Sequence, residues 1–371
     1  MNLSEQQIKE LFTKWHTELP PKMGEIEFKK LFTQFYEEVK PRSRFGPLQL
    51  VVANSHPTLG TQVAKELGIS PLDFELDRFP NQEPKIRRLG DASGCDVCIF
   101  SSLHSRYNTI EELKVICNTL EGSASRVFGV FPFVKNGKSD HQKRHGEPIT
   151  YKSTAEVISE SGVENIAIFD QHTPEHVMAY ETRHTNLKKV HHIYLMRLLI
   201  EYALANMNFD GVIAFDDGGF KRNKTIGVSF LQCNDISFII KARDAHTREV
   251  SIKDSVIIGD VKGKRVITFE DCIQQGGTSK AGAEIAKHNG ADYVAMLVVH
   301  NDFSETTFNR LNPLLEDGTV DEIIVVETLP IIHKEKWHRN LKILSPAKFL
   351  ARVIDHIHCE GHMREFFLEI S

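Results

Sequence analysis

The stretch Val266-Ile-Thr-Phe-Glu-Asp-Cys-Ile-Gln-Gln-Gly-Gly-Thr278 decides the fold, because an apolar run ends there in two adjacent acids and a glycine loop. The residues that follow, 281–286, are typical of a helix. This order predicts a buried strand, an acidic tip, a loop and a helix N-terminus. Glycine N–H groups and the positive end of a helix bind phosphate, and the carboxylates of Glu270 and Asp271 can accept hydrogen bonds from a sugar diol. For this segment alone, an ordinary strand-to-helix turn with chance acids is the alternative.

Composition narrows the class of protein. A chain of 371 residues predicts two domains or slightly more, and 41% hydrophobic with 26% charged residues is typical of a soluble globular protein. A net charge of −5 gives no basic field, so we expect no nucleic acid partner.

The sequence has no apolar run of membrane length and no signal-peptide pattern, so we expect no membrane and a cytoplasmic location. The close pair Cys95 and Cys98 lacks a second pair at zinc-ligand spacing, which favours buried reduced thiols.

The first 45 residues differ from the rest. Apolar residues recur at helical spacing in 8–15 and again in 26–39, and Pro20-Pro21 separates the two runs. This pattern predicts a helical extension, a hairpin with an aromatic face that packs on the main body or on another subunit. Binding to a membrane surface is disfavoured, because lysines do not dominate the polar face.

From Leu48 onward, apolar strands alternate with helices. We predict strands at 48–53, 97–101, 127–131, 166–169, 211–215, 238–241, 256–258, 266–269, 293–299 and 322–326, and helices at 58–67, 109–121, 153–161, 192–205 and 280–288. This alternation predicts an α/β protein with parallel sheets covered on both faces. The strands are too many for one small sheet, so we place a domain boundary near 190, between domains 46–190 and 191–371. In such sheets ligands bind at the carboxyl ends of the strands.

Four further segments place polar side chains in loops or at predicted strand ends. They are Phe79-Pro-Asn-Gln-Glu83, Asp170-Gln-His172, Asp216-Asp-Gly-Gly-Phe-Lys-Arg222 and Lys241-Ala-Arg243. Each segment alone has a plain structural alternative. Asp170 to His172 could form a capped turn. Lys241 and Arg243 could lie on a solvated edge of the sheet. We expect Lys221 and Arg222 to lie on a solvated edge. The remaining histidines, including His176, have no carboxylate partner at useful spacing.

Taken in order with the glycine loop, these segments resemble the ribose-phosphate diphosphokinases, or phosphoribosyl diphosphate synthetases, over nearly all of 48–367. The resemblance implies two type I phosphoribosyltransferase-like domains, the N-terminal one on the ATP side and the C-terminal one, with its C-terminal helices, on the ribose-phosphate side. Residues 1–45 have no counterpart in that family. The implied reaction transfers the diphosphoryl group of ATP to the C1 hydroxyl of a ribose 5-phosphate moiety and releases AMP.

The resemblance assigns an adenine-binding loop and an assembly. Phe79, Asn81 and Glu83 match the loop that grips adenine, usually in the active site of a neighbouring subunit. An aromatic face together with amide and carboxylate edges suits a purine. We therefore expect a homo-oligomer, a dimer or a hexamer.

The resemblance also implies Mg²⁺ as cofactor. Asp170 and His172 match the residues that meet Mg²⁺ and the ATP phosphates, and Asp216 matches an acid near a second metal or the ribose. A hard cation prefers oxygen ligands, so Asp170 is the stronger metal candidate of the first pair.

The catalytic roles follow in the same way. Lys241 and Arg243 match a catalytic loop whose cations stabilise the charge that develops on phosphoryl oxygens. Glu270 and Asp271 match the acids that bind the ribose hydroxyls. Gly276, Gly277 and Thr278 match the loop that binds the ribose phosphate.

The sequence departs from the family at two places. The ATP-binding loop, usually Arg-Gln-Asp, reads Lys138-Ser-Asp140, and lysine keeps the charge but loses the planar fork of arginine. The phosphate loop usually has an acid and a threonine where Gln274 and Gln275 stand. These amides change the volume and hydrogen bonding around a terminal phosphate.

Two acceptors therefore stay open. One is ribose 5-phosphate, bound by a site that has drifted. The other is ADP-ribose, as in phage-encoded relatives assigned to NAD rebuilding. If this chain is phage-encoded, we expect it in the host cytoplasm. Two other functions are a silent, synthetase-associated regulatory subunit, suggested by the altered ATP loop, and a phosphoribosyltransferase, which needs no second ATP-like domain.

Overall fold

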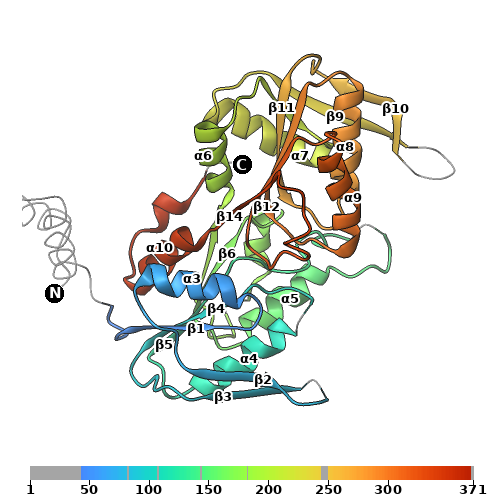
Figure 1. Cartoon of the computed structure of the whole chain (residues 1–371). Helices are drawn as coiled ribbons and strands as arrows, with labels where there is room; N and C mark the ends of the chain where they lie inside the picture. The colour runs from blue at the N-terminus through green and yellow to red at the C-terminus, as the bar shows by residue number, and fades with distance from the viewer. Residues whose placement is uncertain are drawn as a thin grey trace, which may run out of the picture.

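The structure is a computed structural model that describes residues 43–81, 83–106, 108–142, 144–181, 183–243 and 250–368. The predicted N-terminal helical hairpin falls outside the described residues. Two α/β lobes, each built around a mainly parallel sheet, make up the described chain (Figure 1). The predicted α/β class and parallel sheets are confirmed.

The first lobe contains a parallel five-stranded sheet in the order β1-β4-β5-β6-β7. Its strands are β1 (Leu48–Val52), β4 (Asp96–Phe100), β5 (Arg126–Phe131), β6 (Asn165–Phe169) and β7 (Lys189–Ile193). Its helices are α3 (Pro57–Leu67), α4 (Thr109–Leu120), α5 (Thr150–Ser159) and the short η1 (Pro174–Ala179). Helix α3 shows how the sequence sets these bounds, because Pro57 occupies its first turn and Gly68, at φ 70°, ends it in the left-handed conformation that glycine favours.

The second lobe contains a seven-stranded sheet in the order β10-β9-β8-β11-β12-β13-β14. Its strands are β8 (Gly211–Ala214), β9 (Ile236–Arg243), β10 (Val250–Ile258), β11 (Arg265–Cys272), β12 (Tyr293–His300), β13 (Glu322–Val326) and β14 (Leu341–Leu344). Its helical elements are α6 (Met196–Asn206), α7 (Asp217–Thr225), η2 (Ile226–Phe230), α8 (Gly277–His288), α9 (Glu305–Glu316), α10 (Ala347–His358) and η3 (Met363–Phe366). Strand β10 runs antiparallel to β9, and the other described pairs are parallel.

A separate antiparallel hairpin extends from the first lobe. It consists of β2 (Phe74–Arg78) and β3 (Pro84–Arg88), with Phe74 opposite Arg88 (Figure 1). We had not predicted these strands. The segment from Phe79 to Glu83 is therefore the turn of a hairpin.

Two features bear on the proposed boundary near 190. The helix expected from His192 begins at Met196, because His192 and Ile193 belong to β7 of the first sheet. Helix α10, near the end of the chain, returns to pack against α3 of the first lobe (Figure 1). The exact division into domains stays a proposal.

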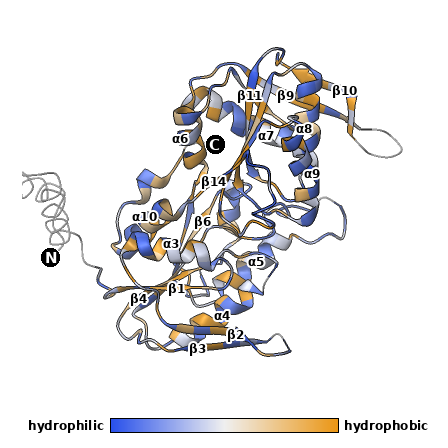
Figure 2. Ribbon diagram, in the orientation of Figure 1, coloured by the Kyte–Doolittle hydropathy of each residue, from blue (hydrophilic) through white to orange (hydrophobic). Residues whose placement is uncertain are grey.

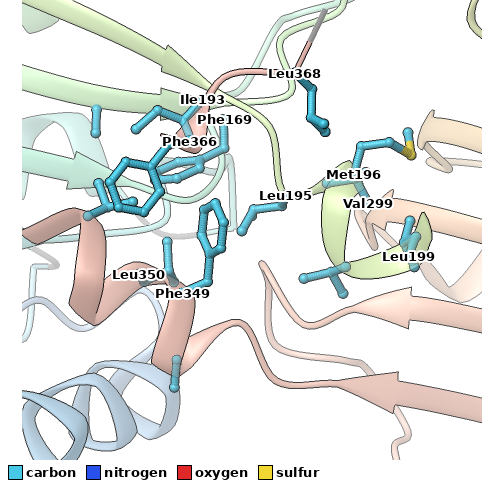
Figure 3. Packing of buried hydrophobic residues seen from close by; sticks show 14 of the residues in the cluster. Phe169, Ile193, Leu195, Met196, Leu199, Val299, Phe349, Leu350, Phe366 and Leu368 are labelled. Carbon is cyan, nitrogen blue, oxygen red and sulfur yellow. The ribbon is translucent and has the colours of Figure 1, made fainter. Parts of the chain in front are cut away.

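One hydrophobic cluster joins the two lobes. Figure 3 shows Phe169 and Ile193 of the first sheet close to Leu195, next to α6. Val299 of β12 belongs to the same cluster. Figure 2 shows apolar residues concentrated along the strands, whereas the helices carry both kinds. Burying each large apolar side chain contributes about 1.5–3 kcal/mol, so this shared core holds the lobes together.

Candidate active site

The carboxyl end of β11 forms the centre of the site. The strand includes Glu270 and Asp271, and α8 begins at Gly277 after the predicted loop, so strand, loop and helix are confirmed. Gly276 caps α8 at φ 72°, and a Cβ atom there would lie 3.1 Å from Cγ of Leu311. This backbone therefore requires glycine.

Arg222 lies between the two acids. Its Nη2 atom is 3.4 Å from Oε2 of Glu270, and its Nη1 atom is 3.4 Å from Oδ1 of Asp271. Only 19% of the Arg222 side chain is exposed, so its assignment to a solvated edge was wrong. Arg222 follows the strand-end acid Asp216 by six positions on α7, and this proximity was the available signal.

His172 and Asp271 connect the two lobes. Nδ1 of His172 lies 2.7 Å from Oδ2 of Asp271. His172 was predicted for ATP and metal binding, and Asp271 for ribose binding. The structure thus brings the two predicted subsites together at the carboxyl ends of β6 and β11.

The two acids on β11 differ in their electrostatics. Burial raises the pKa of Glu270 to about 7. Its Oε1 atom is buried and has no hydrogen-bond partner among the described residues. Burial acts on Asp271 in the same direction, but Arg222, His172 and Lys138 together hold the pKa of Asp271 well below its usual range. Asp271 is therefore the permanently charged member of the pair.

Asp170 and Asp216 each cap a helix. Oδ2 of Asp170 accepts from the backbone N–H of Leu195 at 2.5 Å, and Oδ1 accepts from that of Met196 at 3.2 Å. Burial raises the pKa of Asp170 to about 7, although these two hydrogen bonds act to lower it. Oδ1 of Asp216 accepts from the N–H of Gly219 at 2.9 Å. Their metal-binding roles stay predictions, and Asp170 has both oxygens already engaged.

The predicted ATP loop also reaches the second lobe. Nζ of Lys138 donates to the carbonyl of Cys272 at 2.9 Å. Oδ2 of Asp140 lies 3.1 Å from Nε2 of His176, and Oδ1 lies 2.7 Å from Nδ1 of His141. The expectation that His176 has no carboxylate partner was therefore wrong.

The predicted catalytic cations lie on β9. Nζ of Lys241 donates to the carbonyl of Thr278 at 3.3 Å, which places this lysine beside the glycine loop. Arg243 is the last residue of β9, and its side chain lies outside the described part. The catalytic roles of both residues stay predictions.

The hairpin turn lies apart from these groups within one chain. Phe79 is 46% exposed, and Asn81 Oδ1 accepts from the N–H of Glu83 at 3.3 Å. None of these three residues lines the cavities described next. Their role in binding adenine stays a prediction.

Two cavities flank the acids. One of about 290 Å³ lies at His172 and Arg222, and one of about 600 Å³ lies beside the glycine loop. In the second cavity, Nε2 of Gln274 donates to Oδ2 of Asp302 at 3.1 Å, and the carbonyl of Gln275 accepts from Arg310 at 3.0 Å. A narrow space of about 20 Å³ between the two is lined by both His172 and Gln274.

The described residues contain no group of three or more His, Cys, Asp or Glu arranged to hold a metal ion. Mg²⁺ is commonly held by one or two carboxylates together with substrate phosphates and water. Asp271 keeps its carboxylate charged, but its two oxygens face His172 and Arg222. In the part of the chain that the structure covers, no helix is both long and apolar enough to cross a membrane.

Comparisons with known proteins cover both lobes. Residues 48–162 match the N-terminal domain of ribose phosphate pyrophosphokinase, and residues 234–368 match the phosphoribosyl synthetase-associated domain. A ribose-phosphate pyrophosphokinase of Prochlorococcus marinus is 28% identical over 324 residues, 86% of this chain and 94% of that protein. The Mycobacterium leprae enzyme of the same name is 29% identical over 323 residues, 86% of this chain and 95% of its own. The crystal structure of phosphoribosylpyrophosphate synthetase from Mycobacterium smegmatis is similar with a TM-score of 0.75 and 28% identity, covering 85% of this chain and 100% of that one.

Proposed function

Because the chain belongs to the ribose-phosphate pyrophosphokinase family and is an enzyme of that type, we propose that it transfers the β,γ-diphosphoryl group of Mg-ATP to the C1 hydroxyl of a ribose 5-phosphate moiety. The contact between His172 and Asp271 carries this proposal, because it joins the predicted nucleotide side to the predicted sugar side. A direct transfer needs both substrates at one place, and a contact between the two predicted subsites supports such an arrangement.

The proposed step is an in-line displacement. The C1 oxygen forms a bond to the β-phosphorus, and the bond from that phosphorus to the bridging α,β-oxygen breaks. AMP leaves with the bridging oxygen, and the hydroxyl proton passes to water. Asp271 and Glu270 hold the sugar hydroxyls, while Lys241 and Arg243 stabilise the charge on the phosphoryl oxygens. Mg²⁺ enters with ATP and, when bound, neutralises part of the phosphate charge.

The glycine loop orients the acceptor through its phosphate. Backbone N–H groups at the start of α8 and the positive end of this helix suit the inner phosphate of the sugar. Ribose 5-phosphate and ADP-ribose both contain this moiety. Both therefore stay candidate acceptors.

The direct test is release of AMP by the full chain. We expect AMP in the presence of ATP, Mg²⁺ and either ribose 5-phosphate or ADP-ribose, with the diphosphoryl group recovered on the sugar. Omitting the acceptor is the control for simple ATP hydrolysis. If neither acceptor yields AMP, the transfer proposal fails.

A silent regulatory subunit is the second candidate. The observation that favours it is Lys138, whose ammonium group already donates to the Cys272 carbonyl instead of being held for ATP. This candidate predicts no AMP from the chain alone and a change in the rate of an active synthetase when the two are mixed.

A further inference from the structure

The cavity beside the glycine loop is larger than one phosphate needs. Its volume is about 600 Å³, and neither Glu270 nor Asp271 lines it, so it lies on the phosphate side of the sugar site. At roughly 30 Å³ for each water molecule, a space of this size holds on the order of twenty, so a single phosphate group would leave most of it open. A bound acceptor therefore has room to continue past its 5-phosphate.

The charges around this cavity favour an anion. Arg106, Lys138 and Arg310 line it together with one acid, Asp302. That acid already accepts a hydrogen bond from the Gln274 amide. Three cations facing one engaged carboxylate leave a positive surface next to the N-terminus of α8, which attracts negative charge.

Arg310 presents its charge at the loop itself. It projects from α9, and its Nη1 atom donates to the Gln275 carbonyl at 3.0 Å. A Cβ atom on Gly277 would lie 3.6 Å from the same Nη1 atom. The guanidinium is therefore adjacent to the backbone N–H groups that suit the inner phosphate.

Arg106 approaches the cavity from the other lobe. Its guanidinium donates to the carbonyls of Phe303 and Pro330, the second at 3.1 Å. These bonds use two of its five N–H groups within the described residues, so donors remain for a ligand. No carboxylate of the described residues forms an ion pair with Arg106 or Arg310. Their neutral carbonyl partners fix the two guanidinium groups without cancelling their charge.

From this arrangement we propose, resting on the proposed function, that Arg106 and Arg310 form a second phosphate site for the acceptor. The inner phosphate lies on the glycine loop, and the outer phosphate lies between the two guanidinium groups. The acceptor is then a ribose whose 5-phosphate is part of a diphosphate ester, the class to which ADP-ribose belongs. The neutral amides of Gln274 and Gln275 suit this ligand, because an acid there would repel the additional charge.

Acceptor selectivity tests this proposal. We would measure kcat/KM for ADP-ribose and for ribose 5-phosphate at fixed Mg-ATP, and use the ratio of the two as the readout. We expect the wild-type chain to favour ADP-ribose. Arg106→Ala and Arg310→Ala should each lower the ratio roughly ten- to a hundredfold, the effect of a hydrogen bond to a charged group. Arg310→Lys should recover part of it, and Arg339→Ala, an exposed site away from the cavity, should leave it unchanged.

The contrary result is a ratio that stays the same in both alanine variants, or a wild-type preference for ribose 5-phosphate. Loss of folding would lower both rates together, so the ratio separates it from loss of the second site. Failure of the transfer reaction is separable as well. Isothermal titration of the full chain with ADP-ribose and with ribose 5-phosphate still decides the proposal when no AMP is formed. Equal weakening of both ligands by Arg106→Ala and Arg310→Ala would overturn it.

Discussion

Nδ1 of His172 lies 2.7 Å from Oδ2 of Asp271, although the two residues are 99 positions apart and belong to different lobes. The pair therefore forms only when the carboxyl ends of β6 and β11 face each other. Asp271 also faces Arg222 at 3.4 Å, so one carboxylate links the histidine to a buried guanidinium. Removing its charge changes both partners at once.

Asp271→Asn should lower turnover strongly while keeping the shape of the side chain. We expect kcat for AMP release to fall by roughly 10²–10³-fold, the loss typical of removing one preorganised charged partner from a phosphoryl-transfer site. Asp317→Asn, an exposed site after α9, is the matched control and should keep its rate. A rate within about twofold of wild type in Asp271→Asn would show that this contact has no part in the reaction.

Arg222 should matter for stability as well as for activity. Arg222→Met keeps the length of the side chain but leaves Glu270 and Asp271 buried without their shared cation. We expect the free energy of unfolding at pH 8 to fall by about 3 kcal/mol, measured by urea denaturation. The loss should shrink at pH 5, where Glu270 takes up a proton. Lys221→Met, one residue earlier and exposed, should change it by less than about 0.5 kcal/mol, and an equal effect at both positions would contradict this account.

The raised pKa of Glu270 gives a pH dependence of stability. Its pKa is about 7 in the folded protein against a usual 4.5, so the folded state holds a proton that the unfolded chain has released between these values. The contribution of Glu270 to the free energy of unfolding of the wild-type protein should therefore be greatest below pH 4.5. It should fall as the pH rises from there through 7. Asp170, whose pKa is also raised to about 7, acts in the same direction.

Glu270→Gln replaces the titrating carboxyl with a neutral amide and so removes the part of the pH dependence of stability that comes from Glu270. The variant should gain stability relative to wild type between pH 5 and pH 8, by at most ~3 kcal/mol, because each unit of pKa shift corresponds to about 1.4 kcal/mol. Urea denaturation of both proteins at the two pH values measures the difference. A constant difference across this range would show that Glu270 is ionised throughout.

The sequence predicted the central element of the site but not its contacts. The run from Val266 to Thr278 has a clear apolar stretch, adjacent acids and paired glycines, so strand, loop and helix could be predicted from local pattern. The sequence could not show which of Lys221 and Arg222 points inward. Side chains at neighbouring positions of a helix point in directions about 100° apart, and both residue types are common on a surface. The inward position of Arg222 depends on β11, which lies far along the chain.

Strands β2 and β7 were not predicted, because each gives only a weak local signal in the sequence. Strand β2 reads Phe-Glu-Leu-Asp-Arg, and its alternation of apolar and polar residues covers only four positions, which is a short signal. Strand β7 reads Lys-Val-His-His-Ile, and its two histidines are buried by the tertiary packing around them. Histidine is found both inside and outside proteins, so such a segment carries little local signal.

Lys241 gives a test of the predicted catalytic loop. Its ammonium group is 3.3 Å from the Thr278 carbonyl at the start of α8, close to where phosphoryl charge would develop. Lys241→Ala should lower kcat by roughly 10²–10³-fold, because it removes a cation from the site. The thermal midpoint should stay nearly unchanged, because the side chain is only half-buried near the end of its strand. Lys253→Ala on the paired strand β10 is exposed and should keep its activity. Equal rates in the two variants would mean that the catalytic cation lies elsewhere.

The hairpin turn predicts a shared active site. Phe79 is exposed at the tip of the β2–β3 hairpin, and it does not line the cavities beside His172 and the glycine loop, so we expect its aromatic face to serve adenine in a neighbouring chain. We expect light scattering to give a multiple of 42.2 kDa for the active protein. Phe79→Ala should raise the KM for ATP by roughly three- to tenfold, because stacking on an aromatic ring contributes about 0.5–1.5 kcal/mol.

Mixing two impaired chains, assayed at an ATP concentration well below the KM, tests the sharing directly. A mixed oligomer of Phe79→Ala and Lys241→Ala contains sites that combine an intact hairpin from one chain with an intact Lys241 from the other. After unfolding and refolding together, the mixture should therefore be more active than the sum of the two variants treated separately. Lys241→Ala refolded with itself is the control and should stay inactive. Activity equal to the sum, or an active species with the mass of one chain, would place the whole site within a single subunit.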